Sequence, residues 1–71
     1  MKKQHYNIVI SNQNVKRLSQ QVQEELSILA QDDNIIERIQ YFTYGATVNA
    51  SITYYTYVPS FQNQDHEKLD N

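Results

Sequence analysis

The feature that most constrains the fold is Ile35–Val58, in which two strand-like runs lie on either side of the chain's one glycine, Gly45. The two runs hold five of the six tyrosines. Aromatic and β-branched residues fit the pleated surface of a sheet, and a glycine tolerates the positive φ that a tight turn needs. We therefore expect a hairpin whose strands cover residues 35–44 and 47–58.

The first half of the chain predicts one strand and one helix. Tyr6–Ile10 is short and rich in β-branched residues, which indicates a strand. Ser11–Asn14 offers side chains that can cap a helix, and Asp32–Asn34 favours a turn, so we place the helix at about residues 12–31. Apolar residues spaced by three and four form its expected core stripe: Val15, Leu18, Val22, Leu26 and Leu29.

These elements predict an α+β fold with the order β-α-β-β, in which one helix packs on one face of a three-stranded sheet. At 71 residues the chain has room for a single small domain, which we place at residues 1–59. Residues 60–71 follow Pro59 and are polar or charged except for Phe61 and Leu69. Such a composition buries too little apolar surface to offset ordering entropy, so we expect a flexible polar tail.

Alternation with period two assigns the strand residues to two faces. The face expected under the helix holds Ile8, Ile10, Ile39, Tyr41, Val48, Ile52 and Tyr54. The face expected to be bare holds Ile36, Arg38, Phe42, Tyr44, Tyr55 and Tyr57. Because one helix covers only one face, we expect these last six residues to form an interaction face.

Three occupants of this interaction face are considered: a second copy of the chain, a different protein, and unpaired bases. Aromatic residues are enriched in protein interfaces, and twofold dimers are the commonest oligomers. Base stacking on an open sheet needs surrounding cations, and Arg38 is the cation expected there. We therefore predict a non-catalytic protein–protein interaction module that forms a homodimer and has a heterologous protein partner. The alternative is a single-stranded nucleic-acid-binding accessory protein that uses the tyrosine-rich face.

No residues form a catalytic or metal-binding signature. The chain has no cysteine, and its two histidines, His5 and His66, lie in opposite terminal segments. Asp32 and Asp33 fit a solvated turn better than an acid–base pair, which needs a cleft that shifts the pKa. We expect no enzyme activity, no cofactor and no metal site. The net charge of −2 and the short apolar runs predict a cytoplasmic protein that does not enter a membrane.

The second half of the chain resembles a family of very short sporulation-associated proteins from spore-forming bacteria and their phages. The matching residues are Ile39-Gln40-Tyr41, Ile52-Thr53-Tyr54 and Tyr57-Val58. The chain departs from the family at Arg38, where an acidic residue is common. The resemblance covers about a third of the chain, implies a small bacterial or phage protein and adds no mechanism. The prediction of a regulator or inhibitor that acts by binding another protein comes from the interaction face. The resemblance carries over no catalytic residues.

The composition of the tail gives a first testable prediction. Truncation after Ser60 should leave the melting temperature nearly unchanged, because the removed segment carries only the isolated Phe61 and Leu69 as apolar residues. Circular dichroism melts of the full and truncated chains check this. A loss of several degrees would mean that one of these two side chains packs against the domain.

Overall fold

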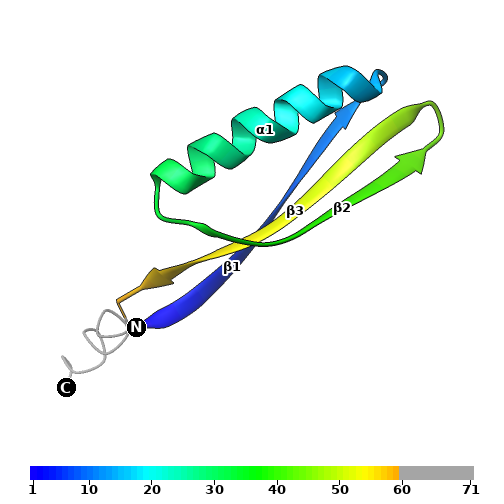
Figure 1. The fold of residues 1–71 in the computed structure, drawn as a ribbon. Coiled ribbons are helices and arrows are strands. Elements are labelled where there is room, and N and C mark those ends of the chain that lie inside the picture. Colours follow the sequence, from blue (N-terminus) through cyan, green and yellow to red (C-terminus); the bar gives the residue numbers. More distant parts are fainter. Residues whose placement is uncertain (60–71) are drawn as a thin grey trace, which may run out of the picture.

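The computed structural model describes residues 1–59, so the expected tail lies outside the described residues. The described part contains β1 (Lys2–Asn12), α1 (Val15–Gln31), β2 (Ile35–Tyr44) and β3 (Thr47–Val58), as Figure 1 shows. The β-α-β-β order and the α+β class are therefore confirmed, and the bounds of both hairpin strands are those predicted.

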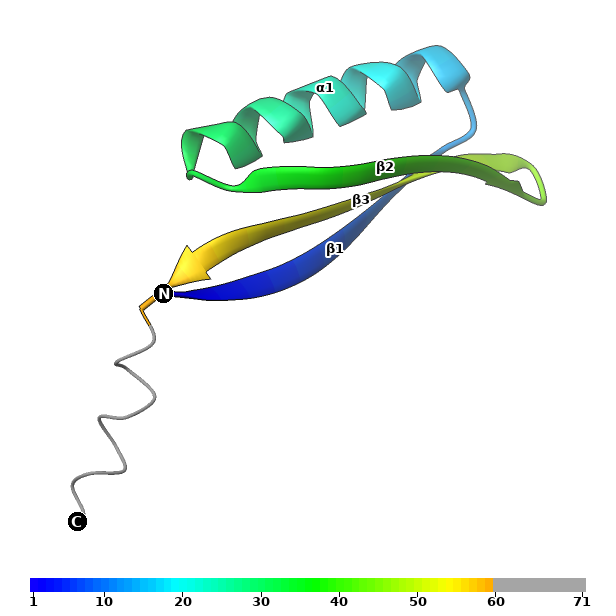
Figure 2. The same cartoon turned by 60° about the horizontal axis from the view of Figure 1, so that its bottom comes forward.

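The last strand in the sequence is the central strand of the sheet. The order is β1-β3-β2, and β3 runs antiparallel to both neighbours. β1 and β2 therefore point the same way on opposite sides of β3. α1 connects them across one face, and within residues 1–59 the other face carries no second layer (Figure 2).

β1 is longer than the sequence predicted. The expected strand was Tyr6–Ile10, but pairing extends from Lys2, which lies opposite Val58, to Asn12, which lies opposite Val48. The polar ends of β1 form a strand because β3 offers a partner at every position along its length. Local composition could not indicate this, since the partner lies more than thirty residues away in the sequence.

A side-chain cap at the start of α1 and backbone hydrogen bonds at its end set the length of the helix. The Asn14 side-chain oxygen accepts a hydrogen bond from the Arg17 N–H at 3.0 Å, which confirms an N-cap within Ser11–Asn14. At the other end Asp33 has φ +61°, and its N–H donates to the Ala30 carbonyl at 3.3 Å. The Asn34 N–H donates to the Leu29 carbonyl at 3.1 Å, which completes a Schellman motif.

The hairpin closes through a loop of two residues. Tyr44 pairs with Thr47, and Gly45 has φ +62° at the first loop position. A positive φ at this position followed by a negative one is the pattern of a type II′ turn, whose twist matches that of the flanking strands. The expected role of Gly45 is confirmed.

The core lies between α1 and the middle of the sheet. Its buried members are Leu18, Val22, Leu29, Ala50 and Ile52. Its partly buried members are Ile8, Ile10, Leu26, Ile36, Ile39, Val48 and Tyr54. Most of the predicted stripe and of the predicted helix-covered face therefore belongs to this core.

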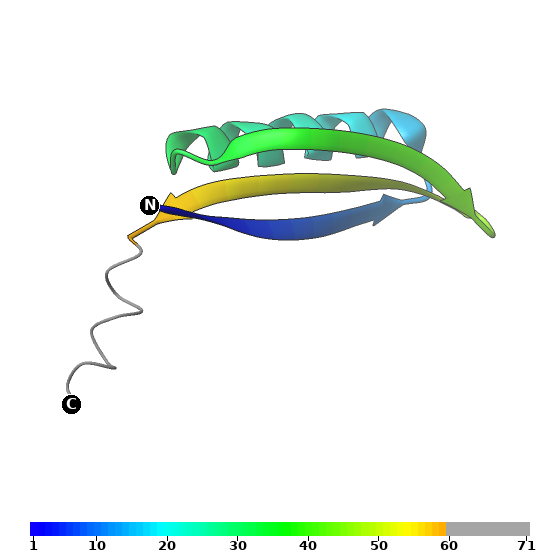
Figure 3. The same cartoon turned by 90° about the horizontal axis from the view of Figure 1, so that it is seen from below.

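Two residues expected in the core are exposed instead. Val15 at the start of α1 is 66% exposed, and Tyr41 on β2 is 61% exposed. Tyr41 lies opposite Ala50 and so occupies the predicted face. Its exposure has a geometric cause, because the hairpin end of the sheet curves away from α1 (Figure 3). The prediction of their burial was wrong.

The helix is also shorter than the sheet. Seventeen residues of α1 extend about 25 Å at 1.5 Å per residue. The twelve residues of β3 extend about 40 Å at 3.3 Å per residue. At the end away from the hairpin, residues 2–4 and 56–58 pair as a two-stranded ribbon beyond β2, past the end of the helix (Figure 1).

The core predicts a strong contrast between two positions on one helix stripe. Leu18→Ala should lower the free energy of unfolding by about 2–5 kcal/mol, because Leu18 is 2% exposed and its loss leaves a cavity. Val15→Ala, the matched control, should change it by less than about 0.5 kcal/mol. Urea denaturation followed by circular dichroism compares them. Equal effects would contradict the observed packing of α1.

The helix C-terminus predicts a stabilising change. Asp33→Gly should raise the free energy of unfolding by about 0.5–1 kcal/mol, since glycine adopts positive φ without a Cβ penalty and removes a negative charge from the negative end of the helix dipole. Asp33→Asn removes the same charge but keeps the Cβ. If the two variants were equally stable, the backbone contribution would be negligible. Chemical denaturation measures both.

Candidate interaction surface

The bare face of the sheet holds five of the six residues predicted for the interaction face. Register places Arg38 opposite Thr53, Phe42 opposite Asn49, and Tyr44 opposite Thr47. These pairs alternate with the buried Ala50 and Ile52 on β3, and Tyr55 and Tyr57 continue the same alternation. The predicted side of the sheet is therefore confirmed for these five residues.

Ile36 lies on the other face, so its predicted position was wrong. It pairs with Tyr54 and packs against the core under α1. The cause is a register shift between Ile36 and Arg38, in which Glu37 is the additional residue of β2. A β-bulge of this kind reverses the face that period-two alternation assigns to residues before it.

The residues on the bare face form two separate groups. Phe42 and Tyr44 lie at the hairpin end, whereas Tyr55 and Tyr57 lie toward the other end of β3. Six residue positions on β3 separate Tyr55 from Asn49, the partner of Phe42, which corresponds to about 20 Å along the strand. The surface between them carries polar side chains such as Gln40 and Ser51. The predicted single aromatic face is thus divided.

The first group, which we call the tyrosine cluster, consists of Lys3, His5, Tyr55 and Tyr57. The rings of Tyr55 and Tyr57 meet edge to face with centroids 5.7 Å apart. The His5 ring centroid lies 5.4 Å from that of Tyr55, and Lys3 Nζ lies 4.5 Å from the Tyr55 centroid. Three neighbours therefore already contact the Tyr55 ring. Lys3 and His5 were not predicted here, because β1 had been expected to begin at Tyr6.

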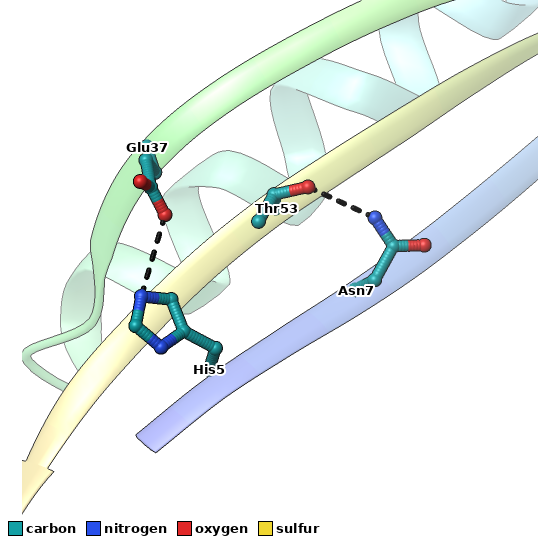
Figure 4. Close-up of polar contacts among 4 residues, drawn as sticks. All are labelled: His5, Asn7, Glu37 and Thr53. Atoms are coloured by element: carbon teal, nitrogen blue, oxygen red, sulfur yellow. Dashed lines mark hydrogen bonds and ion pairs between the residues drawn. The ribbon is translucent and has the colours of Figure 1, made fainter. Parts of the chain in front are cut away.

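Polar contacts link the three strands beside the tyrosine cluster (Figure 4). His5 Nε2 lies 3.5 Å from Glu37 Oε1, with both side chains about half exposed. Asn7 Nδ2 donates to Thr53 Oγ1 at 3.0 Å and lies 2.9 Å from Ser51 Oγ. An exposed pair such as His5–Glu37 contributes little stability. These contacts instead fix the orientation of polar side chains on the bare face.

The second group, which we call the hairpin cluster, consists of Val15, Tyr41, Phe42 and Tyr44. Their exposed fractions are 66%, 61%, 47% and 80%, respectively. The cluster surrounds the free edge of β2 rather than one face, since Tyr41 and Phe42 alternate across the strand. Sequence reasoning missed it because Val15 and Tyr41 had been assigned to the core.

An apolar hollow of about 260 Å³ lies within the hairpin cluster, between the start of α1 and β2. Its lining is contributed by Val15, Leu18, Ser19, Tyr41, Phe42, Thr43, Val48 and Asn49. Asn49, although polar, is 5% exposed, and its amide nitrogen lies 3.3 Å from the Phe42 carbonyl oxygen. One sequence signal indicated that the hairpin end of the sheet would be uncovered. The predicted helix is shorter than the predicted hairpin strands.

The acidic and histidine side chains of residues 1–59 include no group of three that could hold a metal ion. Asp32 and Asp33 are exposed at the end of α1, where they form the predicted turn. His66 lies outside the described residues. No helix within residues 1–59 combines the length and apolar character needed to cross a bilayer.

Comparison with family models, with curated proteins and with solved structures gave no match to this chain. The resemblance to short sporulation-associated proteins therefore stays a prediction.

Proposed function

We propose that this chain is a non-catalytic protein–protein interaction module that self-associates in the cytoplasm and also binds a different protein, as a small bacterial or phage regulator or inhibitor would. The observation that carries the proposal is the hairpin cluster, whose four apolar side chains are each 47–80% exposed. Grouped exposed apolar side chains beside a hollow are typical of binding surfaces. Tyrosine and phenylalanine are also enriched in interface cores.

The small core supports self-association. Only five hydrophobic residues are buried among the described residues. A chain of this length buries about 60% of its unfolded surface, so its stability as a monomer is marginal. With no cysteine available for a disulfide, a second subunit is one of the remaining ways to stabilise so small a domain.

Nucleic-acid binding is the second candidate, and one observation favours it. Lys3 lies on the face that carries Tyr55 and Tyr57, so a second cationic side chain joins Arg38 on that face. Three observations oppose it. Glu37 contacts His5, and Lys3, His5 and Tyr57 already contact the Tyr55 ring, which a base would have to displace. The overall charge of −2 also disfavours a polyanion.

Light scattering tests self-association directly. At micromolar concentration the protein should have a mass of twice 8.4 kDa, because apolar side chains exposed in one copy become buried in the dimer. The dimer mass should persist in 0.5 M salt, because salt screens interactions between charges and does not weaken contacts between aromatic side chains. A monomer mass across the concentration range would contradict self-association and leave only a heterologous partner.

Fluorescence anisotropy with a labelled single-stranded oligonucleotide compares the two candidates on the same sample. The interaction-module proposal expects no binding at physiological salt. Binding that weakens steeply as salt rises, and that Lys3→Ala and Arg38→Ala each reduce, would favour the nucleic-acid candidate instead.

A further inference from the structure

β2 is an edge strand, and its second half has none of the features that prevent edges from pairing. Ile39–Tyr44 contains no charge, proline or glycine. Charges and bulges normally block such edges, but on β2 the bulge and the charges Glu37 and Arg38 lie at the beginning of the strand. Uncharged six-residue segments of high strand propensity pair readily with other strands. The free edge from Ile39 to Tyr44 is therefore competent to bind a further strand.

The opposite edge is different. β1 begins with Lys2 and Lys3, so two copies paired antiparallel along the start of this strand would bring like charges together. β1 is also already covered along its helix side, where Ile8 and Ile10 pack against the core. β1 also exposes Tyr6 and Val9, but β2 carries the larger group of exposed apolar side chains, Tyr41, Phe42 and Tyr44.

The hairpin geometry determines which backbone groups of β2 are free. In an antiparallel pair, alternate residues exchange hydrogen bonds with the partner strand, and the others direct their N–H and C=O groups outward. A two-residue loop makes Tyr44 and Thr47 a bonded pair. By alternation, Thr43, Tyr41 and Ile39 then direct their backbone groups toward the free edge.

We infer that a second copy of the chain pairs with this edge, β2 against β2, antiparallel about a twofold axis at Tyr41. The inference rests on the proposed self-association and names the surface that produces it. Tyr41 lies opposite Tyr41 of the second copy, and Ile39 lies opposite its Thr43. All three residues with outward groups are then paired, in a ladder of about six backbone hydrogen bonds by the antiparallel pattern.

The side chains of β2 favour this arrangement over an unrelated strand. Pairing centred on Tyr41 places Arg38 opposite Tyr44 of the second copy, where a guanidinium can lie over an aromatic ring. It places Gln40 opposite Phe42. A register centred on Gln40 would instead set Thr43 against the bulged Glu37 and lose a bonded pair. The strand is thus more self-complementary in the register centred on Tyr41 than in the one centred on Gln40.

The twofold axis at this position also accounts for the hollow. Antiparallel pairing within one sheet keeps both helices on the same face, so the hollow of each copy adjoins the axis. Tyr41 lines that hollow and is 61% exposed in a single copy. In the pair, the two Tyr41 rings lie next to one another between the two helices and become buried.

Charge substitution at Tyr41 tests the inference, because the axis sets this residue against itself. Tyr41→Lys and Tyr41→Asp should each give a monomer mass in light scattering, since two like charges would meet at the axis. Mixing the two variants in equal amounts should restore the dimer mass. Val9→Lys, on the opposite edge strand and 54% exposed, is the matched control and should remain a dimer. Circular dichroism establishes that each variant is folded.

The possible results separate this inference from the proposed function. A dimer that survives Tyr41→Lys overturns pairing at β2 but leaves self-association standing. Folded monomers that do not combine on mixing overturn the register centred on Tyr41. A monomeric unmodified protein overturns both the inference and the proposed self-association.

Discussion

The contact between one helix and the middle of one sheet holds this structure together. Leu18, Val22 and Leu29 pack on Ala50 and Ile52, and these five residues are the buried hydrophobic core of the described chain. A helix of about 25 Å cannot cover strands of about 40 Å. The exposed hairpin end and the two-stranded ribbon at the other end result from this difference in length, whereas the bare sheet face results from the presence of a single helix in the described chain.

The sequence predicted the order of elements and most of the core because these depend on local patterns. The spacing of Leu18, Val22 and Leu29 indicated the helix, and Gly45 indicated the turn. The face occupied by Ile36 could not be predicted. A bulge depends on how β2 pairs with β3 and produces no repeating pattern in the sequence. The exposure of Val15 and Tyr41 depends on the curvature of the sheet, which is a property of three strands together.

The division of the aromatic residues into two groups changes what the surface can do. In the tyrosine cluster the Tyr55 ring already has contacts within the chain, because Lys3, His5 and Tyr57 surround it. The hairpin cluster has no such internal contacts among its aromatic rings within residues 1–59, and it borders unpaired backbone at an edge. Pairing along the β2 edge would leave the bare face of the sheet accessible. One chain could then bind its own copy at the edge and a different protein on the bare face.

The position of β3 in the middle of the sheet also affects how the chain folds during synthesis. β1 and β2 lie on opposite sides of β3 and do not pair with each other. A nascent chain that has not yet emerged beyond Gly45 therefore contains two strands without a partner, and every ladder contact awaits the last described element. The sheet forms only once β3 has left the ribosome, so its long-range pairing is delayed until the second strand of the hairpin is available.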